Sequence, residues 1–221
     1  MESGFLEKLK SAPASILPRK EPVQARSRER FERILEVAVK LIVDKGIDAV
    51  AMSDIAKGAK ISIASLYQYF PDKAAIIATL AVRYNAEGRN CVEEVFAKVK
   101  VSEDLIPAMH LMLDSYYEFF CNVPEGQAIW QASQSDKRLQ QMDAEDMEFH
   151  AETVSAAFQR ILPNLTIAES LRLGRLFTGI IGTAVRSAIS MDTVEARLFL
   201  EECKNTVLTP SVKKAILQAS N

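Results

Sequence analysis

The sequence predicts an all-α protein, in which an N-terminal three-helix domain with a helix-turn-helix is followed by a second helical domain. Only 8 Gly and 8 Pro occur in 221 residues, so the regular turn signals of an all-β fold are missing. Apolar residues recur at a spacing of three and four over long segments, which is the period of a half-buried helix. A composition of 48% hydrophobic and 25% charged residues is enough for one or two globular cores.

The N-terminal part is predicted to contain an arm and one helix. Residues 1–22 hold three prolines among small and basic residues, so we expect a flexible arm there. A helix is expected over residues 24–45, and Gly46 should end it because glycine accepts the positive φ that follows a last helical turn. The apolar stripe of this helix consists of Phe31, Ile34, Leu35, Ala38, Leu41 and Ile42.

Two short helices are expected next, over residues 54–59 and 63–70. Ser53 and Ser62 are the expected N-caps, because a serine hydroxyl accepts a hydrogen bond from a free N–H of the first turn. Two short capped helices joined by three or four residues form the helix-turn-helix pattern, which we place at about residues 51–70.

The rest of the chain also has a helical pattern. Pro71 should end the second short helix and Asp72 should cap the next one. Further helices are expected over residues 73–99, 103–121, 125–132, 136–162, 167–191 and 193–207. We therefore divide the chain into an arm at 1–22, a first domain at 23–88 and a second domain at 89–221.

The net charge of -2 is unevenly distributed. Basic residues are in excess over residues 1–88, and acidic residues are in excess over residues 89–221. A basic cluster near the start of the first helix would suit phosphate groups, although a solvated helix surface is the alternative. The cluster consists of Arg19, Lys20, Arg26, Arg28, Arg30 and Arg33.

Several classes of protein are excluded by what the sequence lacks. No run of about 18 apolar residues occurs, and charged side chains interrupt the first 20 residues, where a signal peptide would need an apolar core. We therefore expect a cytoplasmic protein without a membrane span. The three cysteines have neither disulfide nor CxxC spacing. The motifs GxSxG and HExxH and a phosphate-binding glycine loop are missing, so we expect no enzyme and no cofactor. Asp143, Asp146 and His150 share a helical face, but this set is too small for us to predict a metal site.

Residues 52–73 closely resemble the DNA-binding segment of the TetR/AcrR family of transcriptional regulators. The residues that carry the resemblance are Asp54, Ile55, Ala56, Ile61, Ser62, Ser65, Leu66, Tyr67, Tyr69, Phe70 and Lys73. With the Arg-rich helix that precedes them, they extend the resemblance over residues 26–88. Lys60 stands where the family usually has Gly, and Ala64 stands where it has Gly or Pro.

This resemblance implies a homodimer that binds double-stranded operator DNA, and a repressor that a small-molecule effector releases. An activator at the same type of site is one alternative, and a helical adaptor that has lost DNA binding is another. If Leu66 and Phe70 face inward, the opposite side of their helix presents small and hydrogen-bonding groups to a major groove. We expect the DNA-binding residues to be Arg28, Ser53, Ser62, Ile63, Ala64, Ser65, Tyr67, Gln68, Tyr69 and Lys73.

The second domain offers candidates for an effector pocket and a dimer interface. Apolar and aromatic side chains with a few amides would suit a hydrophobic or aromatic effector, although such residues are more often plain core. The pocket candidates are Met109, Met112, Leu113, Tyr116, Phe120, Gln127, Trp130, Gln131 and Phe158. Small and apolar residues would let a partner helix approach, and burial within one subunit is the alternative. The interface candidates are Leu171, Gly174, Thr178, Gly182, Val185 and Leu198.

Overall fold

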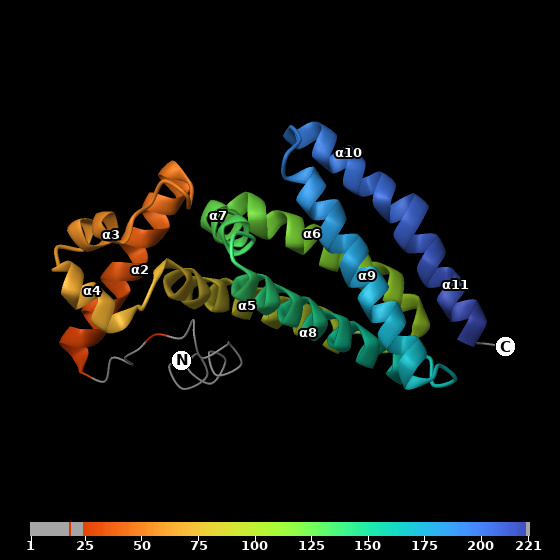
Figure 1. Ribbon diagram of the computed structural model, residues 1–221. Coiled ribbons are helices and arrows are strands. Elements are labelled where there is room, and N and C mark those ends of the chain that lie inside the picture. The colour runs from red at the N-terminus through yellow and green to blue at the C-terminus, as the bar shows by residue number, and fades with distance from the viewer. Residues whose placement is uncertain (1–17, 19–23, 220–221) are drawn as a thin grey trace. The chain divides into compact units, whose positions relative to one another are not determined.

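The computed structural model describes residue 18 and residues 24–219, and in these residues all regular structure is helical (Figure 1). This confirms the predicted fold class. Most of the arm expected at residues 1–22 lies outside the described residues. The elements are α2 (Ala25–Lys45), α3 (Met52–Gly58), α4 (Ile63–Tyr69), α5 (Lys73–Ala97), η2 (Ser102–Asp104), α6 (Leu105–Asn122), α7 (Pro124–Ser133), α8 (Lys137–Ile161), α9 (Ile167–Ala188), α10 (Thr193–Cys203), η3 (Lys204–Leu208) and α11 (Thr209–Ala219).

The chain forms two compact units. The first contains the described residues up to Ala86 together with Val123–Ala144, and the second contains Glu87–Asn122 together with the described residues from Glu145 onward. Helices α5 and α8 therefore contribute residues to both units. Helix α7 belongs to the first unit, whereas we had placed everything after residue 88 in the second domain. The reason is burial, because Ile129 of α7 is a member of the first unit's core.

The core of the first unit forms around α2. The apolar stripe predicted for α2 is buried at Phe31, Ile34, Leu35, Ala38 and Ile42. The rings of Phe31 and Phe70 stack with their centroids 5.0 Å apart, which ties α2 to the end of α4. Helix α2 ends at Gly46, which has the expected positive φ of 74° and donates its N–H to the carbonyl of Ile42.

The second unit is built on the close approach of α8 and α9. A Cβ placed on Gly174 would lie 2.1 Å from the carbonyl oxygen of Ala151, so only glycine allows this approach. The rings of Phe158 and Phe177 stack between the same helices, with their centroids 5.4 Å apart. The two helices therefore pack with backbone nearly against backbone at Gly174 and with aromatic rings beside this contact.

The C-terminal helix was not predicted in full. We expected the last helix to end at about residue 207, but α10 continues through the π-helical turn η3 into α11. Pro210 lies within this continuous stretch of helix, as the second residue of α11. It directly follows the π-helical turn η3, in which the Thr209 N–H bonds five residues back to the carbonyl of Lys204, and this wider turn gives room to the proline ring.

None of the described helices is both long enough and apolar enough to cross a membrane.

Candidate DNA-binding site

Helices α3 and α4 form the predicted helix-turn-helix, with one change at its start. Helix α3 begins at Met52, so Ala51 and not Ser53 is the N-cap residue. The carboxylate of Asp54 accepts a hydrogen bond from the Ala51 N–H at 3.1 Å, and this bond fixes the helix start without a serine hydroxyl. The predicted cap at Ser53 is therefore wrong, and its exposed side chain lies in the first turn of α3.

The turn between the two helices is a Schellman motif centred on Lys60. The N–H of Ile61 donates to the carbonyl of Ala56 at 3.0 Å, and the N–H of Lys60 donates to the carbonyl of Lys57 at 3.1 Å. This pair of bonds requires a positive φ at the residue between Ala59 and Ile61, and Lys60 has a φ of 55°. A lysine with a positive φ costs about 1 kcal/mol or more of conformational free energy. A glycine adopts the same φ without this steric cost.

Helix α4 has a clear inner and outer face. Leu66 and Phe70 are 0% exposed, which confirms the predicted inner face. On the outer face, Ile63 and Tyr67 are 42% and 41% exposed, although both are large and apolar. The hydroxyl of Ser62 accepts a hydrogen bond from the Ser65 N–H at 3.1 Å, which confirms the predicted cap. Ala64 and Gln68 are exposed and Ser65 is half-buried, so the outward side of α4 is small, apolar and amide-bearing.

Tyr69 does not lie on the outer face, which corrects the sequence analysis. Its side chain is buried, and its hydroxyl and that of Ser27 form a hydrogen bond of 3.0 Å. Its ring also meets Phe31 edge to face, with the centroids 6.2 Å apart. Tyr69 therefore joins α4 to α2 and is not available to a phosphate group.

Lys73 also differs from its predicted role as a phosphate anchor. Its ammonium group donates to the carbonyl oxygens of Ile47 and Val50 at 2.6 and 2.8 Å. These carbonyls belong to the segment between α2 and α3, so Lys73 fastens the start of α5 to that segment. Two of its three donors are already engaged within the protein.

The start of α5 is fixed by a second polar contact. Asp72 accepts a hydrogen bond from the Ala75 N–H at 2.8 Å, which confirms the predicted cap. The same carboxylate pairs with Arg138 of α8 at 3.2 Å, within the first unit. Arg138 also bonds to Asp136, and this bond holds the pKa of Asp136 below its usual value.

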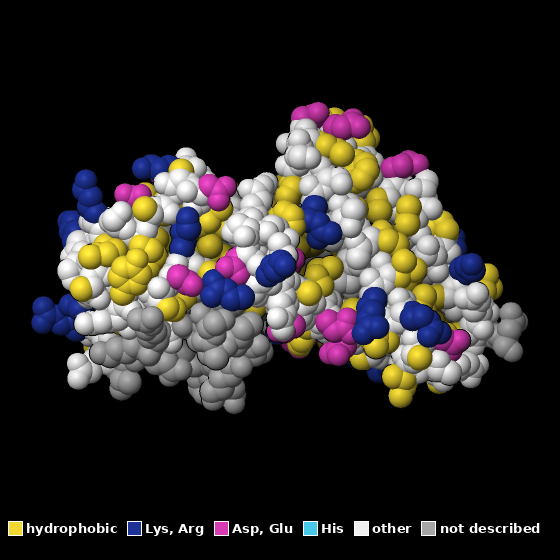
Figure 2. All heavy atoms as spheres, viewed as in Figure 1, with side chains coloured by type: hydrophobic (Ala, Val, Ile, Leu, Met, Phe, Trp, Pro, Cys, Tyr) yellow, Lys and Arg dark blue, Asp and Glu magenta, His cyan; other side chains and the backbone are white. Residues whose placement is uncertain are grey.

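Basic side chains lie around the helix-turn-helix. Arg28 is exposed on α2, and Figure 2 shows Lys and Arg side chains at the edge of the surface over α2 to α4. Lys57 and Lys60 are exposed at the end of α3 and in the turn, and neither was among the predicted DNA-binding residues. Their position directly before the cap of α4 is the signal that could have identified them. Arg19 and Lys20 of the basic cluster lie outside the described residues.

The predicted effector residues fall into two groups. Met109, Met112, Leu113 and Phe120 are buried on α6 of the second unit, as is Phe158 on α8. Tyr116 is half-buried, and its ring lies 5.0 Å from that of Phe120. The remaining candidates, Gln127, Trp130 and Gln131, lie on α7 and belong to the first unit.

Four of the residues predicted to form the dimer interface lie on the face of α9 that the chain itself covers. Gly174, Thr178, Gly182 and Val185 are buried within the chain. A Cβ at Gly182 would lie 3.3 Å from the side chain of Met147, which shows that this face packs on α8. These residues cannot meet a partner subunit, and Leu171 is half-buried.

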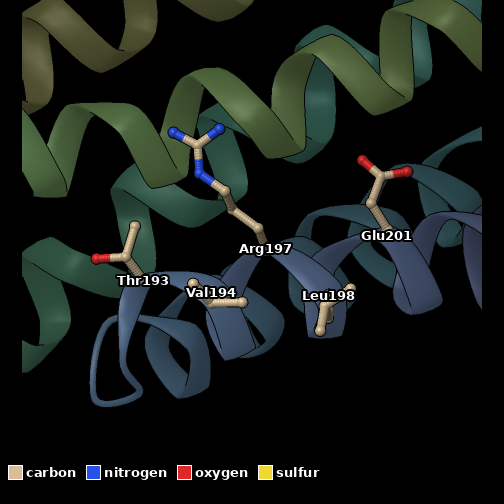
Figure 3. A pocket seen from close by; sticks show the side chains of 5 residues that line it. All are labelled: Thr193, Val194, Arg197, Leu198 and Glu201. Carbon is tan, nitrogen blue, oxygen red and sulfur yellow. The ribbon is translucent and has the colours of Figure 1, made fainter.

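The opposite face of α9 and the adjacent α10 are open. Leu176 of α9 is 52% exposed, and Val194 and Leu198 of α10 are 70% and 61% exposed. Figure 2 shows hydrophobic side chains along the surface of these helices. A surface hollow of about 460 Å³ runs along α10, and the five side chains that line it are shown in Figure 3. Val194 and Leu198 are among the five, so the predicted residue Leu198 lies on an uncovered apolar surface.

The fold and this site define a helix-turn-helix protein of the type found in DNA-binding regulators. Residues 34–80 match the family model described as bacterial regulatory proteins of the tetR family. Residues 103–210 match a second model, described as the C-terminal domain of tetracyclin repressor-like proteins. Together the two models cover most of the chain, and the chain belongs to the TetR family of transcriptional regulators.

Known relatives are similar mainly in the N-terminal part. The HTH-type transcriptional regulator YvdT of Bacillus subtilis is 26% identical over 88 residues, which are 40% of this chain and 44% of YvdT. The HTH-type transcriptional repressor KstR of Rhodococcus jostii is 31% identical in an alignment of 77 positions that covers 31% of this chain and 36% of KstR. The chain thus spans less than half the length of these curated relatives.

Solved structures share the fold at low identity. A Syntrophomonas wolfei protein assigned to the TetR-family regulators superposes with a TM-score of 0.64 at 17% identity, covering 84% of this chain and 96% of that protein. The regulator FadR of Bacillus subtilis, in complex with stearoyl-CoA, superposes with a TM-score of 0.59 at 19% identity, covering 78% of this chain and 96% of FadR.

Proposed function

We propose that the protein is a cytoplasmic DNA-binding repressor that binds its operator as a homodimer and is released by a small-molecule effector. The observation that carries the proposal is the outer face of α4, where Ile63 and Tyr67 remain more than 40% exposed beside exposed Ala64 and Gln68. An exposed helix face with apolar, small and amide groups suits the edges of base pairs in a major groove.

The residues of this face have distinct roles in the proposed complex. The Gln68 amide reads a base edge, most favourably adenine, because an amide matches the N6 and N7 atoms of adenine. Ile63 and Ala64 contact thymine methyl groups, which are the apolar groups of the major groove. The Tyr67 hydroxyl reaches the DNA backbone. Ser62 and Ser65 lie beside these contacts at the N-terminal end of α4.

Phosphate contacts come from basic side chains around the motif. Lys57 and Lys60 flank the turn and Arg28 lies on α2, so all three are candidates for backbone contacts. Ser53 is exposed in the first turn of α3 and is a candidate as well. Lys73 and Tyr69 are not candidates for phosphate contacts, because their polar groups already form the hydrogen bonds described above.

The dimer interface is proposed on the outer faces of α9 and α10. Leu176, Gly179 and Thr183 follow one another at helical spacing on α9, and a Cβ on Gly179 would meet nothing within 4 Å. Val194 and Leu198 continue the apolar surface on α10. Such a surface suits a second copy of the chain, which would cover it by symmetry.

Effector binding is proposed for the second unit. The apolar and aromatic side chains of α6 favour a ligand with an apolar part, and FadR, a structure of the same fold, holds stearoyl-CoA. A ligand releases the repressor only if it binds the free form more tightly than the operator-bound form. Equal effector affinity for the two forms would contradict this part of the proposal.

The test is a selection of genomic fragments that the purified dimer binds, followed by binding to the enriched site over a series of salt concentrations. Gln68→Ala should cost about 1–3 kcal/mol at each half-site and leave binding to random DNA unchanged. Lys57→Gln should weaken binding to all sequences and lower the salt slope by about one unit per site.

The matched control is Gln218→Ala, the same change on the exposed face of α11. It should leave operator affinity unchanged. Wild-type protein that enriches no fragment over random DNA would contradict the proposal and favour the adaptor alternative.

A further inference from the structure

We propose that the part of each operator half-site that faces α4 is a short run of A·T base pairs, which the protein identifies by thymine methyl groups and by adenine. The inference rests on the proposed function, because it names the type of DNA sequence that the same site binds. It starts from the composition of α4, whose seven residues include neither an acidic nor a basic side chain.

The lack of charged side chains limits the base pairs that α4 can select. Arg and Lys are the usual partners of guanine in the major groove, because their N–H groups match its O6 and N7 atoms. Asp and Glu are the usual partners of the amino group of cytosine. Since α4 contains none of these four residue types, it cannot select a G·C pair through a charge-assisted hydrogen bond.

The side chains that α4 exposes match A·T pairs instead. Ile63 is 42% exposed and Ala64 is exposed beside it, and both can contact the 5-methyl group of thymine, which cytosine lacks. The amide of Gln68 is exposed, and an amide donates to N7 of adenine and accepts from its N6 amino group. Apolar and amide groups of this face therefore favour the two bases of the same pair.

The spacing of these residues sets the length of the run. Ala64 and Gln68 are four residues apart on one face of α4, which corresponds to about 6 Å along the helix. Base pairs follow one another every 3.4 Å or so, so the two contacts are about two base pairs apart when α4 lies along the groove. Ile63 directly precedes Ala64 and contacts a neighbouring pair. The run is therefore about three or four base pairs long in each half-site.

Deoxyuridine provides the direct test, because it pairs with adenine as thymidine does and lacks only the 5-methyl group. The probe is the fragment that the full-length dimer enriches in the genomic selection, with one thymine position at a time replaced in both half-sites. Burial of one methyl group corresponds to about fourfold in affinity, so a thymine that faces Ile63 or Ala64 should cost about 15-fold over the two half-sites.

Ile63→Ala separates a methyl contact from an effect of DNA shape. At one thymine position at least, the loss caused by deoxyuridine should fall to about twofold or less in this variant, because the side chain that covers the methyl group is shortened. The matched control is Ile167→Ala, at a residue that is 71% exposed at the start of α9. This control should keep the full loss. A loss that is equally large in Ile63→Ala would assign it to DNA shape.

Selection from a pool of random duplexes identifies the base pair that Gln68 faces. Wild-type protein should enrich an A·T pair at one position of each half-site, and Gln68→Ala should remove the preference at that position alone. Gln218→Ala on α11 is again the control and should enrich the same sequence as the wild type.

Lys60 allows a check of the alternative in which a lysine before α4 selects guanine. Its side chain is exposed in the turn, and we propose above that it contacts phosphate. Lys60→Met should therefore weaken binding to all sequences and leave the enriched sequence unchanged.

Four results would overturn the inference. They are a G·C pair at the position that depends on Gln68, no loss with deoxyuridine at any position, an equal loss in Ile63→Ala, and a guanine preference that disappears in Lys60→Met. In each case the wild-type protein still binds a specific site, so the proposed function is kept. Wild-type protein that enriches no sequence would contradict both.

Discussion

At the scale of single residues, two side chains have roles that their positions in the helix-turn-helix do not predict. Tyr69 lies between residues of the DNA-facing helix, yet it is buried and its hydroxyl bonds to Ser27. Lys60 lies in an exposed turn, yet its φ of 55° makes it a conformational constraint. The contacts with α2 decide the role of Tyr69, and the backbone conformation of the turn decides that of Lys60.

Lys60→Gly should stabilise the first unit. Glycine adopts a positive φ without the steric cost of a Cβ, which is about 1–2 kcal/mol, and loses roughly 0.5–1 kcal/mol of that gain to chain entropy. The expected increase in the free energy of unfolding is up to about 1.5 kcal/mol. It is measured by urea unfolding.

Lys57→Gly is the matched control, because Lys57 lies within α3. Glycine inside a helix costs about 1 kcal/mol, so the same substitution should lower the free energy of unfolding there. Two shifts of the same sign would contradict the account of the turn.

At the scale of elements, a few specific contacts hold the helices in position. Lys73 ties α5 to the segment before α3 through two carbonyls, and Asp72 caps α5 and pairs with Arg138. In the second unit, glycine lets α8 and α9 approach closely. These contacts set the position of each helix more narrowly than apolar burial alone, because hydrogen bonds and steric limits are directional.

Lys73→Met should lower the free energy of unfolding by roughly 1.5–3 kcal/mol, because two carbonyls lose a charged donor. If Lys73 does not touch phosphate, the folded variant should bind DNA with an unchanged salt slope. Lys60→Met, which removes an exposed charge, should lower the slope by about one unit per site. A lower slope for Lys73→Met would restore the phosphate-anchor role predicted from the sequence.

Gly174→Ala should destabilise the second unit by about 1–3 kcal/mol or more, because its Cβ would meet a backbone carbonyl that cannot rotate away. Gly88→Ala on α5 is the control, since a Cβ there would meet nothing within 4 Å. That substitution should stabilise the protein by up to about 1 kcal/mol through helix propensity. Thermal unfolding of both variants checks the two signs.

At the scale of the whole molecule, the proposed function depends on a second copy of the chain. A dimer places two copies of α4 against successive major grooves, so loss of the dimer should lower operator affinity even when each copy of α4 is intact. The apolar surface of α9 and α10 is the candidate interface, and Leu198 is 61% exposed on it.

Leu198→Asp should weaken the dimer by roughly 2 kcal/mol or more, because the interface would then bury an unpaired charge. Sedimentation equilibrium should show monomers, and operator affinity should fall with the dimer. Leu111→Asp is the control, because Leu111 is 49% exposed on α6, a helix that carries none of the proposed interface residues. A stable dimer in the Leu198 variant would place the interface elsewhere.

The fold class, the helix-turn-helix and most helix boundaries could be predicted from the amino-acid sequence alone. These features depend on interactions within one or two helical turns. The Ser62 cap, the positive φ at Gly46 and the inward position of Leu66 and Phe70 are examples, since each is encoded by neighbouring residues.

Which of two suitable faces of a helix is covered could not be predicted from the sequence, because it depends on how the helices pack. Helix α9 has apolar or small residues on more than one side, and the position of α8 buries Gly174 and Thr178 while Leu176 stays open. The same reason explains the burial of Tyr69 against α2, the bonds of Lys73 and the place of α7 in the first unit. A residue's own segment specifies that it can be buried, but contacts with residues far along the chain decide whether it is.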